Sequence, residues 1–229
     1  MIWRKKSGMR GSGVLGTLVI ERVFDGLALV TLAVGTYVLL FQQQHDNRFT
    51  FVIVFACLVF VGILVFGMGT VLFPDKLTKL LTWFFGFFPP HLRAKLLAFT
   101  YAFFDAFKVL PNLVSVTTLF VLSLLIWLTE AFVYFLVALA FQQVTGLHLS
   151  YFHFVFIASI ASLMTLIPSM PGFAGTFDFA VKFTLLRFAV ADQNAQAYTL
   201  VLHIVLWLPV TLVGAYFFVR EGVSTKKII

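Results

Sequence analysis

The chain has 229 residues, of which 61% are hydrophobic and 11% are charged, and its mean hydropathy is +1.03. This composition excludes a soluble globular domain, and apolar runs longer than about 18 residues predict an all-α, polytopic integral membrane helical bundle. The net charge of +7 does not predict nucleic-acid binding, because basic residues in such a chain orient membrane helices and attract anionic lipid head groups.

In chain order, the apolar runs predict about six membrane segments in a single transmembrane domain. These are expected at residues 14–41, 49–73, 113–141, 151–167, 179–190 and 197–219. Between the second and third, residues 74–112 place basic residues among aromatics at helical spacing, which predicts one or two interfacial helices interrupted at Pro89-Pro90. The segment 179–190 is short for a complete crossing, which favours a re-entrant hairpin.

The distribution of basic residues predicts an orientation. They concentrate before the first span, in residues 74–112 and after the last span, whereas the connections 42–48, 142–150 and 191–196 carry only Arg48. The positive-inside rule then places both termini and residues 74–112 in the cytoplasm of a multi-pass protein in the cell membrane.

The hydrophobic pattern breaks once, at residues 167–178, where two prolines and two glycines follow one another closely. Because unsatisfied backbone groups are costly in hydrocarbon, this break must lie at a membrane surface or line a buried polar cavity. Asp178 ends this stretch and Lys182 follows at a spacing of four, which predicts an ion pair on one helix face. The pair is either the wall of a head-group path or an internal salt bridge without further function.

A second charged cluster lies in the first span. Glu21 and Asp25 share a helix face, and Arg22 can reach Asp25 at a spacing of three. The cluster is either a polar cavity wall or the cytoplasmic end of the helix, with Arg22 extending to the interface. Glu130, in the middle of the third predicted span, is a further candidate, paired with Arg22 or Lys182 or held by a hydrogen bond within the bundle.

Signatures of catalysis and of metal binding are missing from the sequence. It contains no phosphate-binding P-loop, no GxSxG, no HxxxH pair and a single cysteine, Cys57. We therefore predict no catalytic residue, no metal and no cofactor, and an enzyme is the less favoured interpretation. His153 and His203 are expected to be interfacial or core histidines.

Two stretches of sequence carry a resemblance to a known family. Residues 21–25 read Glu-Arg-Val-Phe-Asp, and residues 171–178 read Pro-Gly-Phe-Ala-Gly-Thr-Phe-Asp. They are similar to E-R-hydrophobic-x-D and P-G-G-x-G-x-x-E in the flippase-like transmembrane domain of the lysylphosphatidylglycerol synthase family. Phe173 stands where the family usually has its second glycine, and Asp178 stands where glutamate is usual. The resemblance covers nearly the whole chain, and we expect it to correspond to the C-terminal two-thirds of that domain.

The resemblance implies lipid translocation rather than aminoacylation, which belongs to a separate soluble transferase domain in the family. The expected ligand is an anionic phospholipid or a polyprenyl-linked lipid. The candidate head-group residues are Glu21, Arg22, Asp25, Glu130, Pro171, Gly172, Gly175, Asp178 and Lys182. Two alternatives remain: a membrane-embedded enzyme that modifies lipids or glycolipids, similar to a lysylphosphatidylglycerol or dolichol-phosphate-sugar synthase, and a non-catalytic subunit. A homo-oligomer and a complex with a membrane partner are both compatible with these functions.

Overall fold

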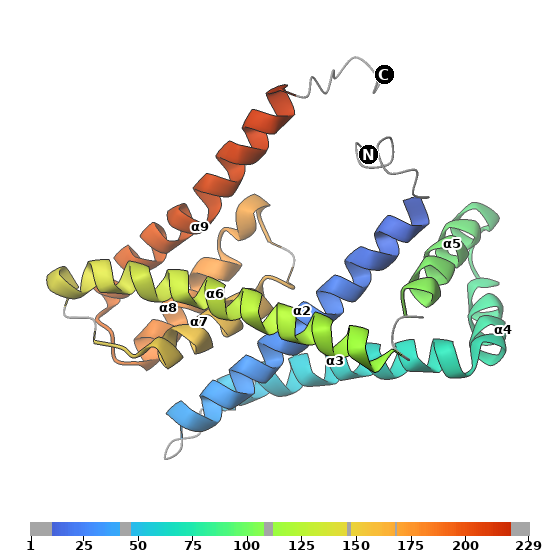
Figure 1. Cartoon of the computed structure of the whole chain (residues 1–229), viewed down its shortest axis with the longest axis horizontal. Helices are drawn as coiled ribbons and strands as arrows, with labels where there is room; N and C mark the ends of the chain where they lie inside the picture. Colours follow the sequence, from blue (N-terminus) through green and yellow to red (C-terminus); the bar gives the residue numbers. More distant parts are fainter. Residues whose placement is uncertain (1–10, 42–46, 108–111, 146–147, 168, 221–229) are drawn as a thin grey trace. The chain divides into compact units, whose positions relative to one another are not determined.

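A computed structural model describes residues 11–41, 47–107, 112–145, 148–167 and 169–220, which form helices joined by short connections (Figure 1). Within these ranges there is no β-strand. The predicted class, a helical membrane bundle, is confirmed. Pro168 lies outside the described residues. So do the basic residues before residue 11 and after residue 220, on which part of the predicted orientation rests.

Among the described residues, four helices are long and apolar enough to cross a membrane. They are α2 (Gly11–Leu40), α3 (Asn47–Leu72), α6 (Leu113–Thr145) and α9 (Asp192–Arg220). The shorter helices are α4 (Pro74–Phe85), α5 (Pro90–Phe107), α7 (Tyr151–Met164) and α8 (Thr176–Arg187), and a 3₁₀ turn, η1 (Pro171–Phe173), precedes α8. With 14 and 12 residues, α7 and α8 span only about 20 Å each at a rise of 1.5 Å per residue, which is less than the roughly 30 Å of bilayer hydrocarbon.

Four helices, α2, α3, α8 and α9, begin two to five residues earlier than the apolar pattern predicted, and the reason is clearest for α8 and α9. Helix α8 begins at Thr176 instead of 179, and α9 begins at Asp192 instead of 197. In both cases the first turn carries an aspartate, Asp178 or Asp192, whose negative charge is favourable near a helix N-terminus. These polar residues therefore belong to helix starts rather than to connections.

The chain divides within α6 into two compact units, Met1–Leu128 and Thr129–Ile229. In the first unit, α2 packs against α3 and α5, and α4 packs against α3 and α5 (Figure 1). A Cβ atom at Gly26 would overlap the ring of Phe60, and one at Gly67 would overlap the ring of Phe107. Glycine therefore allows α2, α3 and α5 to pack closely, as is common between membrane helices.

In the second unit, α8 packs against α7, α9 and η1. Helix α7 is its core, because nearly every residue from Phe154 to Leu163 is buried. The C-terminal half of α6 contributes aromatic contacts, including Phe135 with Phe154 at a ring distance of 5.9 Å. The hydroxyl of Tyr198 on α9 donates a hydrogen bond of 2.7 Å to the backbone oxygen of Tyr134 on α6. These contacts hold α7, α8 and α9 around the break at residues 167–178, the Pro-Gly break.

Candidate functional site

The charged cluster on α2 is centred on Asp25. The Arg22 guanidinium lies 3.8 Å from one Asp25 carboxylate oxygen and 3.6 Å from the Glu21 carboxylate. The hydroxyl of Ser123 on α6 donates a hydrogen bond of 3.1 Å to the other oxygen of Asp25. The predicted contact between Arg22 and Asp25 is therefore present, and α6 adds a partner that the sequence did not indicate.

Exposure differs sharply within this cluster. The Asp25 side chain is 13% exposed, whereas Arg22 is 70% exposed and Glu21 is 57% exposed. Ser123 is also buried. Asp25 is thus the fixed member, bound from two helices, while Arg22 presents its guanidinium outward at distances too long for strong hydrogen bonds.

The Pro-Gly break adopts a left-handed backbone at three positions. The φ angles are +77° at Gly172, +60° at Phe173 and +96° at Gly175. Glycine adopts such angles without steric cost, whereas an L side chain is strained there. The two glycines of the motif are thus required by the backbone, and Phe173, which replaces the usual family glycine, carries the strain.

Gly172 also lies against a side chain of α9. A Cβ atom added at Gly172 would come within 2.8 Å of the indole nitrogen of Trp207. Space as well as backbone conformation therefore favours glycine at this position. At Gly175 no atom lies within 4 Å of an added Cβ, so only its φ angle requires glycine.

Asp178 makes two contacts that fix the break. One carboxylate oxygen accepts a hydrogen bond of 3.0 Å from the backbone N–H of Gly175, which satisfies a free donor at the start of α8. The other oxygen lies 2.6 Å from Nδ1 of His203 on α9. Both side chains are partly buried, with Asp178 32% exposed and His203 21% exposed. The acid of the motif therefore caps its own helix and also joins that helix to α9.

The predicted ion pair between Asp178 and Lys182 is wrong. The Lys182 ammonium is 3.0 Å from the carboxylate of Asp192 at the start of α9, whereas Asp178 binds His203 and the Gly175 amide. Spacing along α8 favoured the local pair, but partners on α9 offer each charge a closer contact. Lys182 therefore joins α8 to α9 at the start of α9.

The predicted ion pair between Glu130 and Lys182 is also wrong, because Lys182 is bound to Asp192. The other expected partner, Arg22, has its ion pairs with Glu21 and Asp25. Glu130 is partly buried on α6 and forms no hydrogen bond or ion pair with another described residue. It is a carboxylate available for an interaction that the described residues do not supply.

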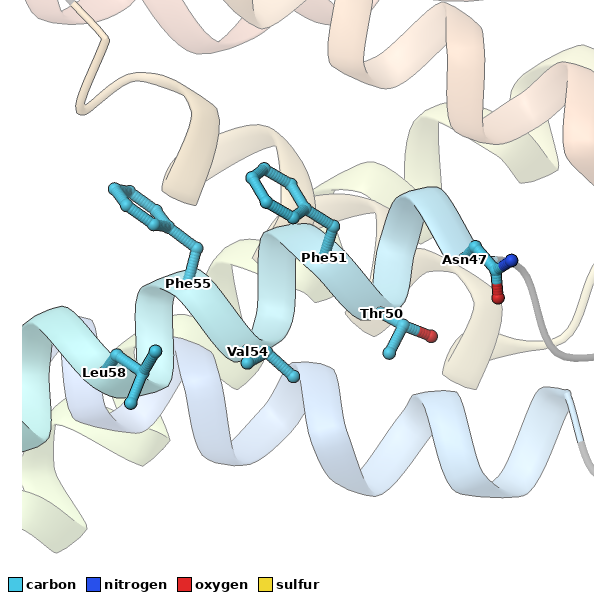
Figure 2. A pocket seen from close by; sticks show the side chains of 6 residues that line it. All are labelled: Asn47, Thr50, Phe51, Val54, Phe55 and Leu58. Atoms are coloured by element: carbon cyan, nitrogen blue, oxygen red, sulfur yellow. The ribbon is translucent and has the colours of Figure 1, made fainter.

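A shallow hollow on α3 does not qualify as a head-group site. Figure 2 shows its lining on one face of the helix, formed by Asn47, Thr50, Phe51, Val54, Phe55 and Leu58. No charged side chain is among them, and the four apolar ones are exposed. This surface suits hydrocarbon rather than a polar head group.

No group of three or more His, Cys, Asp or Glu side chains comes together among the described residues in a way that could hold a metal ion. The residues that the sequence missed are instead hydrogen-bonding and packing partners of the motifs: Ser123, His203 and Trp207. His203 was predicted to be an interfacial or core histidine. The one feature of the sequence that could have indicated a role for His203 is that it is a histidine within a largely apolar helix.

The fold and the two charged elements define a multi-pass helical membrane protein with partly buried acids, one of them beside a broken helix. The chain matches the family model described as the lysylphosphatidylglycerol synthase TM region over residues 1–214, and it belongs to this family. No match was found among curated proteins or among solved structures. The family suggested by the two motifs is thereby confirmed.

Proposed function

We propose that this protein binds the polar head group of a membrane lipid and moves it across the bilayer. The observation that carries the proposal is Asp178, a partly buried carboxylate next to a non-helical break and held by a histidine. Moving a head group through hydrocarbon without partners costs several kcal/mol for each polar group. Polar side chains and free backbone groups along a helix break lower that barrier, as in other transport proteins.

The first unit supports the proposal independently through Arg22. Its guanidinium is highly exposed and lies within 3.8 Å of the carboxylates of Asp25 and Glu21 on the same helix. Guanidinium groups bind phosphate through two parallel hydrogen bonds, which suits the phosphate shared by phospholipids and polyprenyl-linked lipids. Arg22 would therefore bind the phosphate, while Asp25, bonded to Ser123, would keep Arg22 in position.

The remaining candidates have distinct roles in this proposal. Pro171, Gly172 and Gly175 shape the break, and Asp178 lines the path. Glu130 is, after Asp178, the second acid of the second unit that a head group could contact. Lys182 is a structural contact, because its charge is neutralised by Asp192. The membrane is the cell membrane, with both termini in the cytoplasm.

The test is lipid exchange between leaflets. Purified protein is reconstituted in vesicles with fluorescent phospholipids, and the fraction accessible to an impermeant quencher is followed with time. We expect Asp178→Asn and Arg22→Gln each to slow exchange markedly, because each removes a charge from a proposed lipid contact.

The matched control is Asp75→Asn, an exposed aspartate in the first turn of α4. It should exchange lipid at the wild-type rate. Wild-type rates in Asp178→Asn and Arg22→Gln, with both variants folded as judged by size exclusion and circular dichroism, would overturn the proposal.

A further inference from the structure

The contact between His203 and Asp178 leaves one histidine nitrogen available. Nδ1 faces the carboxylate at 2.6 Å, and Nε2 is bonded by no described residue. The ring packs edge-on against Phe177 at a centroid distance of 5.5 Å, and the side chain remains 21% exposed. The imidazole is therefore held in one orientation while its second nitrogen stays free to exchange a proton.

The chemistry of the two groups assigns the protons. An ionised carboxylate only accepts hydrogen bonds, so Nδ1–H donates to Asp178 and Nε2 carries the lone pair. When Nε2 takes up a proton, the imidazole becomes a cation and the charge of the pair changes from −1 to 0. The hydrogen bond to Asp178 then joins two opposite charges, which makes it stronger.

Both contacts between the break and α9 lie on one face of that helix. Asp178 binds His203, and Gly172 lies against Trp207, four residues further along and hence on the same face. Asp178 in turn accepts the Gly175 amide hydrogen bond. A change in the strength of the contact between His203 and Asp178 therefore acts directly on how firmly the break is held against α9.

We propose that His203 and Asp178 form a proton-binding site that couples lipid movement to pH. The coupling rests on the function proposed above. With His203 protonated, the pair is neutral overall and its hydrogen bond is stronger, so the break is held more firmly against α9 and lipid moves slowly. With His203 neutral, the hydrogen bond is weaker and the pair keeps a charge of −1, so lipid moves faster. Exchange should therefore rise with pH as Nε2 of His203 loses its proton.

Further charged or histidine side chains of the second unit lie on α6, α7 and α8. On α8, Lys182 binds Asp192 of α9, and Arg187 lies at the far end of the helix from Asp178. On α7, His153 bonds the Ser150 hydroxyl at 2.8 Å and packs against Phe188. On α6, Glu130 makes no hydrogen bond or ion pair to another described residue. Among the described residues, Asp178 is the ionisable group in contact with His203.

The first experiment detects the proton itself. The sequence has five histidines, so ring-labelled protein in lipid nanodiscs gives five sets of imidazole NMR signals, and His203→Gln assigns the one of interest. We expect the His203 ring signals to change with pH, as uptake of a proton at Nε2 requires. Asp178→Asn should shift the pH at which they change, and Asp75→Asn should not.

The second experiment measures leaflet exchange from pH 5.5 to 8. The protonated fraction of a single site falls about tenfold across the two pH units centred on its titration, so the wild-type rate should rise by up to about that factor. His203→Gln should show a nearly flat profile. His153→Gln is the matched control, because it removes the same ring from the same unit, and it should keep the wild-type profile.

The outcomes separate this proposal from the proposed function. A His203 ring that keeps one protonation state from pH 5 to 8, or whose titration ignores Asp178→Asn, overturns the proton site regardless of lipid exchange. A pH profile unchanged by His203→Gln overturns the coupling. A ring that titrates as expected in a wild-type protein that moves no lipid upholds the proton site and overturns the proposed function.

Discussion

Gly172→Ala offers a quantitative test of the Pro-Gly break. The φ angle of +77° costs an L residue about 1–2 kcal/mol. The new Cβ would also lie 2.8 Å from the indole nitrogen of Trp207. That side chain is 46% exposed and able to turn aside, at a cost of about 1 kcal/mol for leaving its rotamer. The expected loss of unfolding free energy is therefore about 2–3 kcal/mol.

The assay is reversible unfolding in mixed micelles with increasing denaturing detergent. Gly35→Ala is the matched control, because Gly35 is an exposed helical position with no atom within 4 Å of an added Cβ. It should be neutral or stabilising by up to about 1 kcal/mol. Gly175→Ala should lose only the backbone contribution, about 1–2 kcal/mol.

A double-mutant cycle with Trp207→Ala separates the two contributions at Gly172. The steric part, about 1 kcal/mol, should disappear when the indole is removed, and the backbone part should persist. If Gly172→Ala cost no more than Gly35→Ala, the left-handed backbone of the break would be refuted. Zero coupling to position 207 would refute the contact with α9.

Three further substitutions test the surrounding contacts, each by unfolding in the same micelles. Phe173→Gly relieves the strain of a φ of +60° in a half-exposed side chain, and should raise stability by about 0.5–1 kcal/mol after glycine's entropy cost; a loss of stability would argue against that strain. Ser123→Ala removes the hydroxyl bonded to the Asp25 carboxylate and should cost about 1.5–3 kcal/mol; an unchanged value would mean that Asp25 does not depend on α6. Lys182→Met breaks a pair whose acid is 67% exposed and should cost at most about 1 kcal/mol; a larger loss would give Lys182 more than a surface role.

The helical fold followed from the sequence because membrane chains have few alternatives. Backbone groups in hydrocarbon must bond within their own segment, so each long apolar run becomes a helix. Hydropathy also located the interruption at Pro89-Pro90 and the break near Gly172, where proline and glycine end helices. It misjudged where α8 and α9 begin, because Asp178 was assigned to the end of the break and Asp192 to a connection, although both acids stabilise helix starts.

The candidate site was only partly predictable for a different reason. Contacts within one helix follow from spacing, and that rule correctly paired Arg22 with Asp25. The same rule failed for Asp178, whose partner His203 lies 25 residues away on another helix. Ser123, which bonds Asp25 from 98 residues away, was equally hidden. Such contacts depend on how helices pack, and one sequence contains no local record of that packing.

The motif differences also acquire a physical meaning in the structure. The glycine that the family usually has at position 173 would suit the left-handed backbone found there. The shorter acid at position 178 still reaches the Gly175 amide and the His203 ring together. Replacing glutamate by aspartate therefore keeps an acid at the start of α8, and here that acid both caps the helix and binds α9.

The most direct test of the central claim is the rate of phospholipid exchange between leaflets in vesicles, with wild-type protein compared with Asp178→Asn. The proposed head-group path predicts rapid exchange with the wild type and markedly slower exchange with the variant, while Asp75→Asn matches the wild type. Equal rates for folded wild-type and Asp178→Asn protein would contradict it.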